Sequence, residues 1–199
     1  MDLYDILKFV GKPLLKFPFH YNTKVEGKEN LPQGKAIIAA NHISYLDPIF
    51  ICTYLKKKTH FFTKAECFGL PFCSWFLKAI KQIEIEEDKI SKKNLEEALQ
   101  VLQKNEYFGI FPEGTRSYDG KLQKARKGVA LIARLSSAPI VPIAIKGTYD
   151  IYPRKANFPK LYSNVLIKIG KPIFSKDYEK KDKNELTNLV MQKIARLYS

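Results

Sequence analysis

The sequence has few cysteines and no clustered metal ligands. Its three cysteines, Cys52, Cys67 and Cys73, lack the spacing of a metal site and cannot all pair in disulfides, which favours a reducing compartment. The three histidines are dispersed along the chain, and no Cys/His cluster accompanies them. We therefore expect no bound metal.

Long apolar stretches are also absent. No uncharged apolar run approaches the roughly 18 residues of a membrane-spanning helix. No small-residue cleavage site follows an apolar core near the N-terminus, so a secretory signal is not expected. Residues 1–20 place apolar residues at helical spacing with lysines between them, but Gly11 and Pro13 interrupt the pattern. Two interpretations stay open for this segment: a helix packed on the domain, or an amphipathic anchor at a membrane interface.

Acidic residues are scarce relative to basic ones. The chain has 20 Asp and Glu against 34 Lys and Arg, a net charge of +14, which attracts nucleic acid, anionic lipid or phosphorylated substrates. The sequence also carries 13 Phe and 11 Tyr, and basic residues beside aromatic ones favour a membrane interface. No helix-turn-helix, zinc spacing or aromatic RNA-binding pattern is present, so nucleic acid is not the expected partner.

Length and pattern predict a single α/β domain formed by residues 21–199. Short apolar or alternating runs predict strands, and runs with apolar residues three or four apart predict helices. Their alternation predicts a mostly parallel central sheet flanked by helices, in which ligands bind at the carboxyl ends of the strands. Pro142 suggests that its strand is an edge strand or contains a bulge. Strands are expected at 36–40, 59–63, 83–86, 107–111, 140–145 and 165–169, and helices at 48–55, 71–80, 91–104, 128–135 and 185–197.

The stretch AANHISYLDP at 39–48 combines a histidine and an aspartate five positions apart. Asp47 followed by Pro48 predicts a helix start with the acid at the cap. Residues five apart diverge by about 140° on a continuous helix, so His42 is expected in the preceding loop, folded back towards Asp47. That pairing leaves one ring nitrogen as a base. The alternative is that Asp47 is only a cap and His42 only a polar loop residue.

The stretch FPEGTRS at 111–117 follows another expected strand. Arg116 offers a planar fork for phosphate, and the turn at Gly114 and Thr115 offers backbone N–H groups. Glu113 would bind a substrate hydroxyl or hold Arg116 in place. The alternative is a strand-ending turn with an exposed ion pair. A base beside an anion-binding turn, with no GxSxG-type nucleophile in the chain, indicates chemistry on a hydroxyl of a phosphorylated substrate.

These two stretches resemble the first and third signature blocks of the glycerolipid acyltransferase family, the 1-acylglycerol-3-phosphate acyltransferases. KAECFGLPF at 64–72 resembles the second block, with Lys64, Glu66, Phe68 and Pro71 in register, and IVPIAI at 140–145 resembles the fourth. The resemblance covers roughly residues 35–150 in the correct order. It implies an enzyme with an α/β acyltransferase domain.

The resemblance also implies the reaction and the residues that perform it. A fatty acyl group would pass from acyl-CoA or acyl-carrier protein to the sn-2 hydroxyl of lysophosphatidate, giving phosphatidic acid without an acyl-enzyme. His42 would be the general base and Asp47 its orienting partner. The substrate-binding residues would be Glu113, Gly114, Thr115 and Arg116, with Lys64 as a second phosphate contact or a solvated surface lysine. Asn41 and Ser44 would shape the loop, the helix at 70–80 would flank the acyl tunnel, and no cofactor beyond the co-substrate is expected.

The sequence departs from the family pattern in one place that bears on the acceptor. Lys81 stands where the family commonly has glycine, and Glu87-Asp88 where it commonly has a phosphate-binding arginine. Lys81, Lys64 or Lys89 would then substitute for the arginine, or the acceptor is another lysolipid. An inactive lipid-binding scaffold of the same fold is a further alternative.

The expected location is peripheral, on the cytoplasmic side of the cell membrane. Members of the family often carry hydrophobic N-terminal helices, whereas this sequence offers only residues 1–20 for that purpose. Attraction between its basic surface and anionic lipid would supply the remaining affinity, at about 1 kcal/mol for each Lys or Arg near the membrane.

Overall fold

The computed structural model describes residues 20–65, 77, 78, 80–86 and 90–199, together with Tyr4, Ile6 and Pro13. Most of the 1–20 segment, most of the second signature block, the expected helix at 71–76 and residues 87–89 lie outside the described residues. Tyr4 is buried, and its hydroxyl donates to the carbonyl oxygen of Thr59 at 3.2 Å. Tyr4 therefore packs on the domain.

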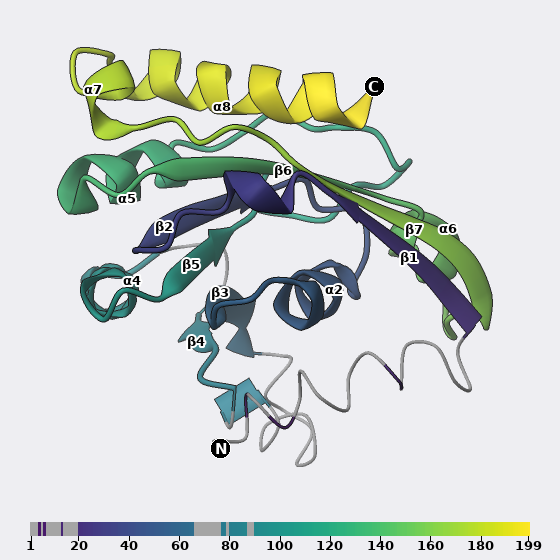
Figure 1. Ribbon diagram of the computed structural model, residues 1–199. Helices are drawn as coiled ribbons and strands as arrows, with labels where there is room; N and C mark the ends of the chain where they lie inside the picture. The colour runs from purple at the N-terminus through teal and green to yellow at the C-terminus, as the bar shows by residue number, and fades with distance from the viewer. Residues whose placement is uncertain are drawn as a thin grey trace.

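The described chain folds around a seven-stranded sheet with the order β1-β7-β6-β2-β5-β3-β4 (Figure 1). Only β6 and β7 pair antiparallel within it, and the other pairs are parallel. The predicted α/β fold with a mostly parallel sheet is confirmed. The strands are β1 (His20–Glu26), β2 (Ala36–Ala40), β3 (Thr59–Lys64), β4 (Ile83–Ile85), β5 (Tyr107–Ile110), β6 (Ile140–Lys146) and β7 (Tyr162–Ile169).

Strand β1 is the strand that the sequence pattern did not predict. It lies at the edge of the sheet, parallel to β7, and its sequence HYNTKVE has few apolar residues. Only Tyr21 of this strand is fully buried. An edge strand that is mostly exposed does not need the apolar run or strict alternation by which strands are recognised.

Helices cover both faces of the sheet because its central strands are apolar on both sides. In β2, Ile37 and Ala39 face one core, and Ala36, Ile38 and Ala40 face the other. Helices α4, α5 and α8 pack on the first face, and α2 packs on the second (Figure 1). The helices are α2 (Asp47–Tyr54), α4 (Lys92–Gln103), α5 (Gly128–Ser136), α6 (Thr148–Ile151), α7 (Ser175–Tyr178) and α8 (Lys183–Tyr198), with a 3-10 turn η1 (Lys28–Asn30).

Pro142 lies in β6, between β7 and β2, so the expectation of an edge strand is wrong. Its missing N–H falls where the pairing with the β7 segment is interrupted. Ile143 pairs with Ile169, whereas Ile140 bridges Ile173, so the partner segment has one more residue than β6 across this interval. The extra residue forms a bulge opposite Pro142, which confirms the second expectation.

The strand order brings three loops to one edge of the sheet. Strands β6, β2 and β5 are parallel neighbours, so the segments that follow them meet at their carboxyl ends. These segments are the His42 loop after β2, the EGTR turn after β5 and the short helix α6 after β6. The two signature stretches are thereby brought side by side, as the parallel topology requires.

Candidate active site

The loop after β2 is fixed by buried polar contacts to the β6 side. The Asn41 amide exchanges two hydrogen bonds with the backbone of Ile145, at 3.0 and 2.8 Å. The Ser44 hydroxyl donates to the carbonyl oxygen of Tyr152 at 2.8 Å and accepts from the N–H of Leu46 at 3.2 Å. Asn41 and Ser44 therefore shape the loop as expected, and the Ser44 hydroxyl is committed to the backbone.

Within this loop, His42 folds back onto Asp47 as predicted. Nδ1 of His42 lies 2.8 Å from Oδ2 of Asp47, and the carboxylate is fully buried. The same oxygen accepts the backbone N–H groups of Ile43 and Ser44, at 2.7 and 2.8 Å. Asp47 is the first residue of α2 and not its cap, because its carboxylate turns back into the loop. The expectation that Asp47 caps the helix is therefore wrong, and its side chain serves His42.

The contacts of the pair fix the tautomer of His42. The Asp47 carboxylate is surrounded by hydrogen-bond donors and therefore accepts a hydrogen bond from His42. Nδ1 of His42 must then carry the proton of that bond. Nε2 then has a lone pair, and no described residue forms a hydrogen bond with it. The imidazole ring stacks on Phe111, with centroids 3.9 Å apart and an interplanar angle of 11°. The ring is oriented on one side by Asp47 and on its face by Phe111, a residue that the sequence reasoning did not single out.

Glu113 connects the EGTR turn to the His42 loop through hydrogen bonds. One oxygen of its buried carboxylate accepts the backbone N–H of His42 at 2.9 Å, and the other accepts that of Gln123 at 2.8 Å. Burial raises the pKa of Glu113 to about 7, against the opposing effect of these two hydrogen bonds. Among the described residues it forms no ion pair with Arg116, so the expectation that it holds Arg116 is wrong. Its role towards a substrate hydroxyl stays a prediction.

The rest of the EGTR turn wraps around the His42 loop. Gly114 adopts a φ of 69°, and a Cβ there would lie 2.8 Å from Cδ of Arg126. The N–H of Ser117 donates to the carbonyl oxygen of His42 at 2.8 Å. The Arg116 guanidinium lies 3.2 Å from the ring centroid of Tyr45, and its Nη1 is buried without a hydrogen-bond partner among the described residues. The alternative of an exposed ion pair at this turn is therefore wrong.

Two further residues reach this site from the segment after β6, and sequence reasoning missed both. Thr148 begins α6, and its hydroxyl donates to Oδ1 of Asp47 at 2.6 Å. Arg154 follows α6 and donates to Oγ1 of Thr115 at 3.0 Å. The available signal for Thr148 was the glycine before it: Gly147 has a φ of 86°, and a Cβ there would overlap the carbonyl oxygen of Asn164.

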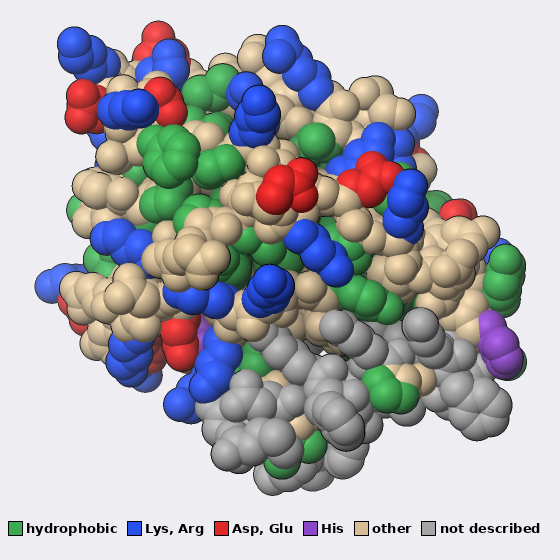
Figure 2. Space-filling model, in the orientation of Figure 1, with side chains coloured by type: hydrophobic (Ala, Val, Ile, Leu, Met, Phe, Trp, Pro, Cys, Tyr) green, Lys and Arg blue, Asp and Glu red, His purple; other side chains and the backbone are tan. Residues whose placement is uncertain are grey.

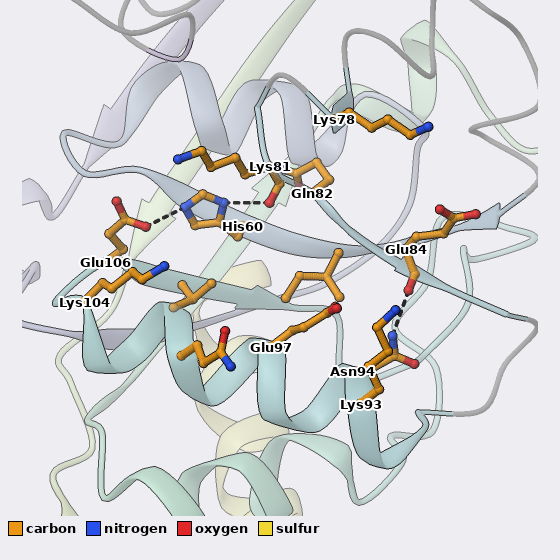
Figure 3. Close-up of a pocket in the computed structure, with 13 residues that line it drawn as sticks. His60, Lys78, Lys81, Gln82, Glu84, Lys93, Asn94, Glu97, Lys104 and Glu106 are labelled. Atoms are coloured by element: carbon orange, nitrogen blue, oxygen red, sulfur yellow. Dashed lines mark hydrogen bonds and ion pairs between the residues drawn. The ribbon is translucent and has the colours of Figure 1, made fainter.

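The lysines that were expected near phosphate fall in different places. Lys64 is the last residue of β3, at the carboxyl edge, and its phosphate contact stays a prediction. Lys81 precedes β4, at the amino ends of the strands. Its carbonyl oxygen lies 2.8 Å from Nδ1 of His60, whose Nε2 lies 2.9 Å from Glu106 (Figure 3). Lys81 therefore does not replace the missing arginine.

The cavity beside Lys81 is separate from the candidate site. It has a volume of about 410 Å³ and lies between β4 and α4, and lysine and glutamate side chains project along it (Figure 3). None of the residues that line it belongs to the His42 loop or the EGTR turn. Among the described residues, no group of three or more metal-ligating side chains comes together, and no helix has the length and apolar character needed to cross a bilayer.

Comparison with known proteins assigns the chain to a family. Residues 22–146 match the family model described as acyltransferase. The chain belongs to the acyltransferase family. The expected resemblance to this family is thus confirmed.

Three relatives of this acyltransferase chain show how far the similarity extends. The chloroplastic 1-acyl-sn-glycerol-3-phosphate acyltransferase LPAT1 of Arabidopsis thaliana is 34% identical over 79% of this chain and 45% of its own length. The 1-acyl-sn-glycerol-3-phosphate acyltransferase of Bacillus subtilis is 30% identical over 78% of this chain and 75% of its own. The crystal structure of PlsC from Thermotoga maritima, a 1-acyl-sn-glycerophosphate acyltransferase, superposes with a TM-score of 0.84 at 28% identity, covering 98% of this chain and 77% of that one. The chain spans about half the length of the plant relatives it matches.

Proposed function

We propose that this protein transfers a fatty acyl group from a thioester donor, acyl-CoA or acyl-carrier protein, to the sn-2 hydroxyl of 1-acylglycerol-3-phosphate. The product is phosphatidic acid, a precursor of phospholipids. The relatives named above bear this activity in their names. The observation that carries the proposal is the 2.8 Å contact of His42 Nδ1 with buried Asp47, beside the turn that carries Arg116, whose Nη1 is buried with no hydrogen-bond partner among the described residues.

The geometry supports direct attack by the acceptor hydroxyl. Nε2 of His42 takes the hydroxyl proton as the oxygen forms a bond with the thioester carbonyl carbon. Asp47 stabilises the imidazolium that results, because its carboxylate accepts the Nδ1 proton. When the C–S bond breaks, the thiolate leaves and receives the proton from Nε2. The Ser44 hydroxyl does not compete as a nucleophile, because it donates to the carbonyl oxygen of Tyr152.

The same chemistry needs no metal or resident cofactor in our proposal. The thioester supplies both an activated carbonyl and a good leaving group, and His42 moves the proton. The phosphate of the acceptor would lie at the EGTR turn, where the planar Arg116 guanidinium suits its oxygens. Stacking on Tyr45 holds that guanidinium in one plane, so less of its side-chain entropy is lost when phosphate binds.

We place this reaction at the cytoplasmic face of the cell membrane, with the protein bound peripherally to anionic lipid. Lysine and arginine side chains are spread over the visible face, with fewer acidic ones between them (Figure 2). The segment after Arg154 exposes Phe158 by 83%, Leu161 by 62% and Tyr162 by 65%. Lys155 and Lys160 lie among these apolar side chains and are also exposed. Apolar and basic groups in one exposed segment suit the lipid headgroup region.

The test is a transfer assay with purified protein. Wild-type protein is incubated with lysophosphatidate and a labelled acyl-CoA or acyl-carrier protein, and phosphatidate is quantified. We expect product with at least one donor and near-complete loss in His42→Ala. His20→Ala, which removes an exposed histidine at the start of β1, is the matched control and should stay active.

Other outcomes separate the alternatives. Activity that survives His42→Ala would contradict the base mechanism. Faster acylation of a different lysolipid would favour the other acceptor. Lipid binding with no transfer from either donor would favour the scaffold.

A further inference from the structure

Arg154 reaches the EGTR turn from a segment that lies beyond the family match, which ends at residue 146. It follows α6, on the β6 side of the site. Its Nη1 donates to Oγ1 of Thr115 at 3.0 Å and to the carbonyl oxygen of Arg116 at 3.3 Å. Its guanidinium carbon lies 4.1 Å from the ring centroid of Tyr118. Arg154 is therefore held in a defined orientation on the same turn that carries Arg116.

The turn thus has two guanidinium groups at it, and no carboxylate within the described part of the chain pairs with either. Among the described residues, neither Arg116 nor Arg154 forms an ion pair. Among the described residues, Nη1 of Arg116 is buried without a hydrogen-bond partner, and the hydrogen bonds of Arg154 use only Nη1. Glu113, three residues before Arg116, turns its oxygens to the backbone of His42 and Gln123. Asp119, three residues after Arg116, accepts from the Ser117 hydroxyl and the backbone N–H of Lys121. Two cations on one turn repel each other unless an anion binds between them.

We propose that Arg154 is the second guanidinium of the acceptor phosphate site and that it makes the site selective for a phosphomonoester. This inference rests on the proposed function. A phosphomonoester carries about −1.5 to −2 charges near neutral pH, whereas the phosphodiester of other lysophospholipids carries a single charge. Two guanidinium groups match the charge of the phosphomonoester, whereas one guanidinium would be enough for the phosphodiester.

The placement of Arg154 also accounts for the arginine that the sequence lacks after the second signature block. Lys81, which precedes β4 at the amino ends of the strands, contacts Nδ1 of His60 through its backbone carbonyl oxygen. Arg154 supplies a guanidinium from the opposite side, through the corner after β6. In this proposal, a residue between β6 and β7 sets the acceptor selectivity.

The experiment compares wild-type protein with Arg154→Ala, Arg154→Lys and the control Arg196→Ala, which removes an exposed arginine from α8. Initial rates are measured with lysophosphatidate and with lysophosphatidylglycerol, a phosphodiester acceptor. We expect Arg154→Ala to raise the KM for lysophosphatidate about tenfold or more with little change in kcat, and to reduce the preference for it over lysophosphatidylglycerol. Arg154→Lys keeps the charge and should be intermediate. Arg196→Ala should match wild type.

Two outcomes of these kinetics would overturn the inference. If Arg154→Ala lowers kcat for both acceptors alike, Arg154 only braces the turn. If it changes neither KM, Arg154 does not contact phosphate. Should wild-type protein acylate no lysolipid, the proposed function fails, and equilibrium binding of glycerol 3-phosphate then tests Arg154 separately. Weaker binding to Arg154→Ala than to wild type would support the phosphate site, and equal binding would refute it.

Discussion

The hydroxyl of Thr148 donates a 2.6 Å hydrogen bond to Oδ1 of Asp47, across 101 positions of sequence. Both side chains are fully buried. Because the other oxygen, Oδ2, holds His42 and two backbone N–H groups, Thr148 satisfies the oxygen that these contacts leave unpaired. The carboxylate that orients the base is therefore fixed from the β6 side as well as from its own loop.

We expect Thr148→Val to lower kcat about tenfold or more, because a carboxylate that rotates away from His42 misplaces the base. The KM for lysophosphatidate should change little, since Thr148 contacts Asp47 and not the EGTR turn. Thr148→Ser keeps the hydroxyl and should retain most of the activity. Steady-state kinetics of the two variants decide the matter: a rise in KM at constant kcat, or equal losses in Val and Ser, would contradict a positioning role.

Glu113 should make the protein less stable as the pH rises. Burial raises its folded-state pKa to about 7, against 4.5 in the unfolded chain, so the folded state holds more protons between these values. The stabilisation is complete below pH 4.5 and is lost as the pH rises through about 7, by about 3 kcal/mol in total. Glu113→Gln has no ionisable group there and should lack this dependence.

The measurement for Glu113 is urea denaturation of wild type and Glu113→Gln between pH 5 and pH 8. The difference in free energy of unfolding should shift in favour of Glu113→Gln by about 2–3 kcal/mol over this range. Other titrating groups cancel in that difference. A difference that stays constant with pH would show that Glu113 ionises normally in the folded protein.

Much of the fold could be predicted because the signals are local. The buried strands β2, β5 and β6 are apolar runs, and Ser91, the first residue of the expected helix at 91–104, forms a capping box with Asn94 at the start of α4. Strand β1 was not predicted because an exposed edge strand needs no apolar run. The position of Pro142 was ambiguous because a missing N–H is tolerated either at an edge or at a bulge, and only the pairing partners distinguish the two.

The site was predictable only where its residues are close in sequence. His42 lies in the loop before α2 and Asp47 is the first residue of that helix, so their contact followed from helix geometry. Thr148 and Arg154 join the site through the parallel order β6-β2-β5, which no local pattern contains. The contact of Glu113 with the backbone N–H of His42 was missed for the same reason, because it joins two loops 71 positions apart.

Lys81 occupies a backbone position that favours glycine, which gives the family preference at that position a physical reason. Its φ is 54°, its N–H donates to the carbonyl oxygen of Lys78, and the N–H of Gln82 donates to that of Leu77, both at 2.9 Å. These two bonds form a Schellman motif, whose left-handed residue is most often glycine. Lys81→Gly should raise the free energy of unfolding by about 1 kcal/mol.

The matched control for that substitution is Lys78→Gly, three residues earlier at a helical position, which should lower the free energy of unfolding by about 1 kcal/mol. Denaturant midpoints at unchanged slope report both values. Equal destabilisation by the two substitutions would mean that the left-handed conformation of Lys81 carries no strain.

The exposed apolar segment after Arg154 should contribute to membrane binding. Phe158 and Leu161 are 83% and 62% exposed, so replacing both with serine should leave the free energy of unfolding nearly unchanged. Binding to vesicles that contain phosphatidylglycerol should fall about tenfold, since these side chains no longer enter the headgroup region. Leu135→Ser, which alters an exposed leucine on α5, is the control and should bind like wild type. Vesicle sedimentation measures each partition. Unchanged sedimentation of the Phe158→Ser, Leu161→Ser double variant would show that this segment does not touch the bilayer and would direct attention to residues 1–20.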